Sequence, residues 1–220
     1  MTNYREILRL HSLGLNVNLA PVCDIALDPG SFLYSRSLGA DPITTGQYVS
    51  GTLERMAEYG VGGVMKHFPG YGENGDTHVA SILDSRSLEE LEGKDLIPFR
   101  TGIQTGLGAI MVSHNRVAAL DADTPASLSP AVIGYLRDTM GYDRVVITDD
   151  LSMGALEDYT PEEAAVLAVK AGADLLCSTD FESQLSAVLE AARSGEISQD
   201  RVDEAVYRVL SWKAQLGLIG

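Results

Sequence analysis

Short apolar runs rich in β-branched residues alternate along the chain with longer segments in which apolar residues recur at helical spacing. The short runs predict five strands, at residues 17–22, 61–65, 109–112, 144–147 and 173–176. Because these strands alternate with helices of roughly 10 to 18 residues, the pattern predicts a parallel sheet with right-handed crossover connections. Continuous apolar strands such as residues 145–147 are typical of a sheet that helices cover on both faces.

Residues that cap helices mark the ends of most helical segments. Asp41 followed by Pro42 predicts the start of a helix that ends before Gly60. The sequences that open at Ser87 and Thr160 are each typical of a capping box. The predicted helices cover residues 42–59, 88–105, 130–140, 161–171, 181–193 and 199–215.

Polar side chains gather at the carboxyl-terminal ends of the predicted strands. They are Asp24, Lys66, His67, Ser113, His114, Asp149, Asp150, Thr179 and Asp180. In a (β/α)8 TIM-type barrel this edge is the catalytic face, and an open doubly wound sheet also binds ligands there. The pattern favours the barrel, and no GxGxxG or GxxxxGK[ST] motif supports a nucleotide-binding sheet. A closed barrel needs eight strands, so either strands are missing from this chain or the sheet is open.

Composition excludes several classes of protein. The chain has 220 residues, of which 45% are hydrophobic, so it can bury a sizeable core. Its formal net charge of -15 argues against a nucleic-acid partner, because phosphates would be repelled. The apolar runs are no longer than strands, so we expect no membrane span. Cys23 and Cys177 lie in apolar runs and are predicted to be free, buried thiols. Residues 1–6 lack the apolar stretch of a signal peptide, which makes the cytoplasm the expected location.

Three of the four histidines follow predicted strands, which points to a shared site. One use is a metal, since His67, His78 and His114 with Asp149 could ligate zinc or another divalent ion. However, the chain contains no HxH or HExxH motif, and Lys66 would repel a cation. We therefore expect no metal and favour acid–base chemistry.

Asp76 and His78 are spaced so that the carboxylate and the imidazole can form a hydrogen bond. Such a bond fixes the tautomer of the ring and suits it to donate and then accept a proton. The alternative is an Asx-type turn that caps the glycine-rich loop.

Asp149 and Asp150 end the fourth predicted strand. Side chains alternate along a strand, so Asp149 shares the face of Val145 and Ile147, while Asp150 points the other way and could cap a turn. A carboxylate at a barrel mouth can attack an anomeric carbon. The alternative is a pair of turn or helix-cap aspartates.

Three basic side chains could bind substrate hydroxyl groups. Arg36 lies in a loop with little apolar pattern and could hold hydroxyls or a carboxylate, although a solvated surface arginine is the commoner case. Lys66 and His67 could likewise donate hydrogen bonds to sugar hydroxyls.

Residues 66–72 read KHFPGYG and are followed by DTH at residues 76–78. Together these motifs closely resemble glycoside hydrolase family 3, in particular its β-N-acetylglucosaminidase branch. Further segments follow in the family's order over nearly the whole chain. They are GLNVNLAPVCD at 14–24, SRSLG at 35–39, IMVSH at 110–114, PASLS at 125–129, VITDDLSM at 146–153 and AGADLL at 171–176.

The resemblance implies roles for individual residues. Asp149 matches the nucleophile, and His78 matches the acid/base of the β-N-acetylglucosaminidase branch with Asp76 as its partner. Thr77 stands where serine is commoner. The residues that match the binding site of the N-acetylglucosamine ring are Arg36, Lys66 and His67, with Asp24 and His114 near that site.

The implied activity is removal of terminal, non-reducing β-linked N-acetylglucosamine, including from peptidoglycan fragments as in bacterial peptidoglycan recycling. The implied mechanism is a retaining double displacement through a glycosyl-enzyme intermediate, with no cofactor. The loop that carries His78 is expected to move during turnover.

The chain departs from the family at its N-terminus, where about two further barrel strands normally precede Gly14. We therefore expect one catalytic barrel domain over residues 1–220, N-terminally incomplete, with exposed sheet edges through which copies could self-associate. A signal peptide could have been lost with the same segment. The alternatives are a phosphorylase of the same family, a truncated non-catalytic sugar-binding domain and a metal-dependent barrel hydrolase.

Overall fold

The computed structural model describes residues 4–220 of the chain. Residues 1–3, on which part of the signal-peptide expectation rests, lie outside the described residues. The chain forms two compact units. Unit 1 comprises the N-terminal part as far as Gly75 together with Leu88–Met111 and Ser211–Gly220, and unit 2 comprises Asp76–Ser87 and Val112–Leu210.

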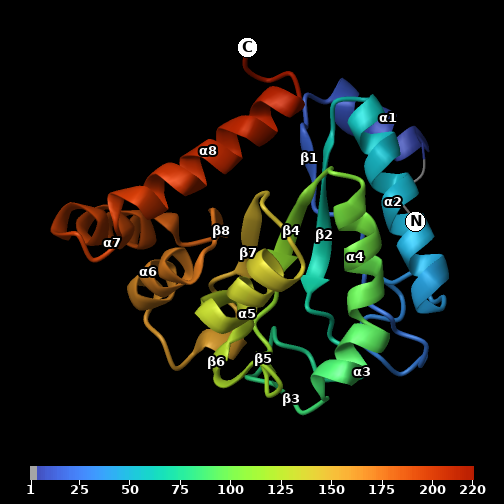
Figure 1. Cartoon of the computed structure of the whole chain (residues 1–220), viewed down its shortest axis with the longest axis horizontal. Helices are drawn as coiled ribbons and strands as arrows, with labels where there is room; N and C mark the ends of the chain where they lie inside the picture. Colours follow the sequence, from blue (N-terminus) through green and yellow to red (C-terminus); the bar gives the residue numbers. More distant parts are fainter. Residues whose placement is uncertain (1–3) are drawn as a thin grey trace. The chain divides into compact units, whose positions relative to one another are not determined.

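Unit 1 is built from parallel strands and the helices that pack against them. Its elements are α1 (Tyr4–Ser12), β1 (Val17–Asn18), α2 (Pro42–Glu58), β2 (Gly62–Phe68), α3 (Leu88–Gly93), α4 (Leu96–Gln104) and β4 (Ala109–Val112), of which Val112 belongs to unit 2. β1 pairs in parallel with β2, and β4 lies on the other side of β2. α2 and α4 run side by side and both contact β2 (Figure 1). Gly102 of α4 allows this packing, because a Cβ atom there would collide with the sulfur of Met65.

Unit 2 combines a parallel strand pair with a small separate sheet. Its elements are β3 (Leu83–Asp84), β5 (Arg116–Val117), β6 (Asp121–Pro125), η1 (Ala126–Leu128), α5 (Pro130–Gly134), the π-helical turn η2 (Tyr135–Thr139), β7 (Val146–Asp150), η3 (Gly154–Leu156), α6 (Pro161–Ala171), β8 (Leu175–Cys177), α7 (Phe181–Ser194) and α8 (Gln199–Gln215). The residues of α8 from Ser211 onward belong to unit 1. β7 pairs in parallel with β8, and Ile147 lies opposite Leu175. α6 packs against α7 (Figure 1).

The predicted ends of two helices, α2 and α6, are confirmed. Asp41 caps α2 by accepting hydrogen bonds from two backbone amides, and Gly60 beyond its end has a φ of 66°. Thr160 and Glu163 form the predicted capping box of α6, and this helix ends at Gly172 with a φ of 116°. A positive φ is inexpensive only for glycine, so these residues stop the helices where the sequence indicates.

The helix expected over residues 88–105 is instead two helices, α3 and α4. Pro98 explains the break, because it lacks an amide hydrogen and its ring would clash with the carbonyl of Lys94 in a continuous helix. In the helix expected over residues 130–140, the second half is the π-helical turn η2.

The strand predicted at residues 144–147 lies later, at Val146–Asp150, because pairing with β8 extends it beyond its apolar run. The sheet of β3, β5 and β6 was missed, since its strands are short and carry no alternating apolar pattern. Both cysteines are free, as predicted, although Cys177 is only half-buried. None of the helices within residues 4–220 has the length and apolar character needed to cross a bilayer.

The α/β class with parallel strands is thus confirmed. Closure into an eight-stranded barrel and a single domain over residues 1–220 stay predictions.

Asp174 is the most heavily bonded carboxylate of unit 2. Its side chain is fully buried just before β8 and forms ion pairs with three arginines. Arg137 of η2 donates at 2.7 Å and Arg201 of α8 at 2.6 Å. Asp174 Oδ2 also accepts the amide hydrogen of Val146 at 2.9 Å, at the first residue of β7. One buried charge therefore ties together η2, β7, the start of β8 and α8.

We predict that Asp174→Ala lowers the free energy of unfolding by about 3 kcal/mol, because it leaves partly buried guanidinium groups without their counter-charge. Urea denaturation at pH 7 measures this change. Glu196→Gln is the matched control in unit 2, since its pair with Lys170 is about half exposed and should contribute no more than about 1 kcal/mol. Equal losses in the two variants would contradict the prediction.

Candidate active site

In unit 1, a buried carboxylate organises the end of β2. Asp24 Oδ2 accepts the backbone amide hydrogen of His67 at 3.0 Å and lies 2.9 Å from Nδ1 of the same residue. Asp24 Oδ1 accepts the amide hydrogen of Tyr71 at 2.9 Å. Both oxygens are thus engaged within the protein, so the geometry gives Asp24 the task of orienting His67.

The pKa of Asp24 reflects two opposing effects. Burial disfavours the charged form, but the charge and hydrogen bond of His67 and the amide hydrogens of Tyr71 and His67 outweigh it. The pKa therefore lies below its ordinary value, and Asp24 is a carboxylate at neutral pH.

Arg36 lies on the opposite side of the His67 ring. Its Nη2 is 3.4 Å from Nε2 of His67. Because a carboxylate accepts, Nδ1 of His67 donates to Asp24. Unit 1 therefore brings Asp24, His67 and Arg36 together, and Lys66 directly precedes His67 on β2.

In unit 2, Asp76 and His78 form the predicted pair. Oδ1 of Asp76 lies 2.6 Å from Nδ1 of His78 and also accepts the backbone amide hydrogen of His78 at 2.9 Å. The carboxylate–imidazole pair and the Asx-type turn, considered as alternatives, are therefore both present. Half of the His78 side chain is exposed, so its Nε2 is the ring atom suited to exchange a proton with a ligand.

Backbone contacts anchor the His78 loop to the segment that follows β7. Gly154 donates its amide hydrogen to the carbonyl of His78 at 3.2 Å, and Ala155 donates to that of Thr77 at 3.1 Å. A Cβ atom on Gly154 would lie 3.0 Å from the His78 carbonyl oxygen, so a larger residue there would require the loop to shift by a few tenths of an ångström. Movement of the loop during turnover stays a prediction.

Asp149 and Asp150 form the end of β7 and are both partly exposed. As predicted, Asp150 closes a turn, since its Oδ1 accepts from the amide at 3.0 Å and the hydroxyl at 2.8 Å of Ser152. Asp149 Oδ1 accepts the amide hydrogen of Asp150 at 2.9 Å. Because the turn holds the side chain of Asp150, Asp149 is the carboxylate of the pair that is better suited to contact a ligand.

His114 is fully buried beside this strand end. Its Nδ1 lies 2.6 Å from Oγ of Ser127, and its Nε2 lies 2.9 Å from the carbonyl oxygen of Asp150. Burial lowers its pKa, the negative charges of Asp149 and Asp150 act against this, and His78 adds to the lowering. Asp149 and His78 therefore act on the same imidazole, which places both in one electrostatic cluster of unit 2. Because both ring nitrogens have protein partners, the geometry favours a positioning role for His114 over contact with a sugar.

The sequence analysis missed Ser127, Tyr71 and Gly154 as supporting residues. Ser127 lies in the PASLS segment noted above, but nothing in the sequence indicates that its hydroxyl meets His114. Among the described residues, no three His, Cys, Asp or Glu side chains gather as metal ligands would.

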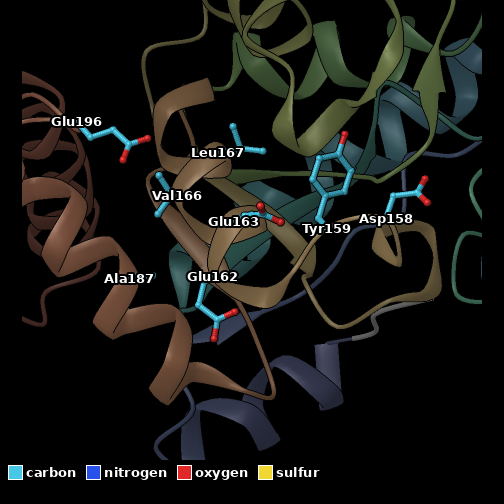
Figure 2. A pocket seen from close by; sticks show the side chains of 8 residues that line it. All are labelled: Asp158, Tyr159, Glu162, Glu163, Val166, Leu167, Ala187 and Glu196. Carbon is cyan, nitrogen blue, oxygen red and sulfur yellow. The ribbon is translucent and has the colours of Figure 1, made fainter.

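A cavity of about 530 Å³ in unit 2 lies elsewhere, between α6 and α7 (Figure 2). Apolar side chains of α6 and four carboxylates line it, namely Val166, Leu167, Asp158, Glu162, Glu163 and Glu196. No predicted site residue lines this cavity. The candidate site therefore rests on the chemistry of the strand ends.

Comparisons with known proteins found similar sequences. The family described as "Glycosyl hydrolase family 3 N terminal domain" matches residues 6–212. Beta-hexosaminidase LpqI of Mycobacterium tuberculosis is 35% identical over 217 residues, which cover 93% of this chain and 56% of LpqI. The chain thus spans about half the length of this curated relative.

Solved structures are also similar. A family 3 β-N-acetylglucosaminidase from Paenibacillus has a TM-score of 0.92 and 36% identity, over 99% of this chain and 44% of that one. The structure of M. tuberculosis LpqI has a TM-score of 0.89 and 35% identity, over 96% of this chain and 64% of that one.

We predict that Asp24 stabilises the fold above about pH 4 and that this contribution is lost as pH falls. A carboxyl group with a lower pKa when folded favours the folded state only where it is ionised. Asp24→Asn should therefore be less stable than the parent at pH 7, and the difference should narrow towards pH 3. Denaturant unfolding at several pH values measures it. With Asp123→Asn, an exposed control, the difference should not change with pH, and a constant difference for Asp24→Asn would contradict the prediction.

Proposed function

The chain belongs to glycosyl hydrolase family 3, and from this premise we propose that it is a retaining glycosidase that removes terminal, non-reducing β-linked N-acetylglucosamine. The observation that carries the proposal is the arrangement in unit 2, where the loop of the Asp76–His78 pair is hydrogen-bonded through Gly154 to the segment that follows Asp149 at the end of β7. Relatives with the name beta-hexosaminidase support the substrate class. Fragments of peptidoglycan are the proposed natural substrates.

In the first step, a carboxylate oxygen of Asp149 attacks the anomeric carbon and the glycosidic bond breaks. His78 Nε2 gives its proton to the departing oxygen, and Asp149 becomes esterified to the sugar. Asp76 holds the Nδ1 proton of the ring, which keeps Nε2 as the proton-transfer atom.

In the second step, His78 Nε2 accepts a proton from water while the water oxygen attacks the anomeric carbon. The ester bond to Asp149 breaks and the carboxylate is restored. Two inversions at the same carbon give net retention. A histidine suits this role, because it adds no negative charge close to the nucleophile.

Binding of the sugar is proposed to involve Arg36, Lys66 and His67. The support is the arrangement in unit 1, where Asp24 and Arg36 hold His67 from both sides. Guanidinium, ammonium and imidazole groups can all donate to hydroxyl oxygens. Completion of a (β/α)8 barrel around the site is part of the same proposal.

Asp149→Ala is expected to lower kcat/KM by at least about 1,000-fold on 4-nitrophenyl β-N-acetylglucosaminide, because the nucleophile is lost. Release of nitrophenol measures the rate, and the first-formed anomer, followed by NMR, reports retention. Asp158→Asn, an exposed carboxylate of unit 2, is the control and should keep the parent rate.

Unchanged activity in Asp149→Ala would refute the proposal, and so would an inverted product from the parent. Adding inorganic phosphate separates the phosphorylase alternative, which predicts sugar 1-phosphate in place of the free sugar.

His78→Ala should slow release of sugar or alkyl aglycones by about 100- to 10,000-fold, because these leaving groups need a proton. Formation of the glycosyl-enzyme from a dinitrophenyl glycoside should slow far less, since dinitrophenolate leaves without one. Stopped-flow measurement of the dinitrophenolate burst separates this step from hydrolysis. His11→Ala, an exposed histidine, is the control. Equal losses on both classes of substrate would contradict the assignment of His78 as general acid.

A further inference from the structure

We propose that His114 is a positioning residue, which holds the carbonyl of Asp150 and through that residue fixes the carboxylate of Asp149. The inference rests on the proposed function, because it assigns His114 a task in the same reaction. It concerns unit 2 alone.

The hydrogen bonds of His114 define its state. A carbonyl oxygen can only accept, so Nε2, 2.9 Å from the oxygen of Asp150, must carry the hydrogen. Nδ1 then accepts the hydroxyl hydrogen of Ser127 at 2.6 Å. Ser127 is itself buried, and its amide donates to the carbonyl of Ser113 at 3.0 Å. The ring is therefore held in one tautomer and one orientation.

Asp150 transmits this constraint to the nucleophile. Its amide hydrogen is bonded to Oδ1 of Asp149 at 2.9 Å, and its carbonyl is bonded to His114. The next amide, that of Leu151, donates to the carbonyl of Cys177 in β8 at 3.0 Å. The Asp150 carbonyl also accepts the amide hydrogen of Met153 at 3.1 Å, so loss of the His114 bond removes one of its two partners. With this constraint gone the backbone at Asp150 is freer to rotate, and the amide that orients Asp149 moves with it.

A neutral ring suits this task. Burial lowers the pKa of His114, Asp149 and Asp150 oppose the shift, and His78 adds to it. A neutral imidazole donates a hydrogen bond to the backbone without neutralising the carboxylate of Asp149. The nucleophile thus keeps its charge while its orientation is fixed.

Two substitutions separate positioning from burial. The amide nitrogen of glutamine can occupy the place of Nε2, so His114→Gln keeps a donor towards Asp150. Asparagine reaches only the place of Nδ1, so His114→Asn keeps the partner of Ser127 but loses the bond to Asp150. We expect His114→Asn to lower kcat by about 10- to 100-fold with KM changed by less than about 3-fold, and His114→Gln to stay within about 3-fold of the parent. Equal losses in the two variants, with both folded, would overturn the proposal.

Azide tests whether His114 acts through Asp149. In Asp149→Ala, added azide can attack the anomeric carbon, expel nitrophenolate and form a glycosyl azide of inverted configuration. Because this reaction bypasses Asp149, adding His114→Asn to Asp149→Ala should leave the azide-dependent rate within about 2-fold. A further loss of 10-fold or more would show a role that does not pass through Asp149 and would overturn the proposal.

Amide hydrogen exchange tests the same link without activity. The amide of Asp150 should exchange about 10-fold faster in His114→Asn than in His114→Gln, and equal rates would overturn the proposal. An inactive parent chain would refute the proposed function, whereas exchange would still decide whether His114 fixes Asp150. An active parent with indistinguishable Gln and Asn variants would refute the positioning role alone.

Discussion

The burial of the Asp174 carboxylate is the constraint on which the architecture of unit 2 depends. A buried charge is costly unless charged and polar groups surround it, and here three arginines and one backbone amide do so. That amide belongs to Val146, the first residue of β7, and Asp149 lies three residues further along the same strand. The carboxylate that binds the arginines thus also fixes the start of β7.

In unit 1, a buried aspartate likewise binds backbone amides, at the end of a different strand. Asp24 is buried and accepts backbone amides from His67 and Tyr71, so the end of β2 and the following loop are fixed by one carboxylate. In both units a buried aspartate satisfies amide groups that regular pairing leaves open. This explains why irregular segments next to the strands can hold functional side chains in defined orientations.

Three histidines that the sequence singled out, one in unit 1 and two in unit 2, are each oriented by an oxygen atom, but the oxygen differs. His67 meets the buried carboxylate of Asp24, His78 meets the partly exposed carboxylate of Asp76, and His114 meets a backbone carbonyl. The environments suit three tasks, namely binding, proton transfer and positioning. Only His78 combines a carboxylate partner with an exposed ring, which is what an acid that must reach its substrate requires.

Local patterns in the sequence determined the ends of α2 and α6, the main parallel strands and the pairing of Asp76 with His78, because these depend on residues close together in the chain. Asp41, Thr160 and Gly172 act on their own helices, and the spacing of Asp76 and His78 suffices for their contact. The sequence also indicated the chemistry of Asp149 through its resemblance to a family. Only the tertiary structure decided that β7 extends to Asp150, that Asp174 forms ion pairs with three arginines and that both ring nitrogens of His114 have partners inside the protein. Those features join residues 13 to 37 positions apart, and no local pattern records which distant group will fill a buried hydrogen-bonding site.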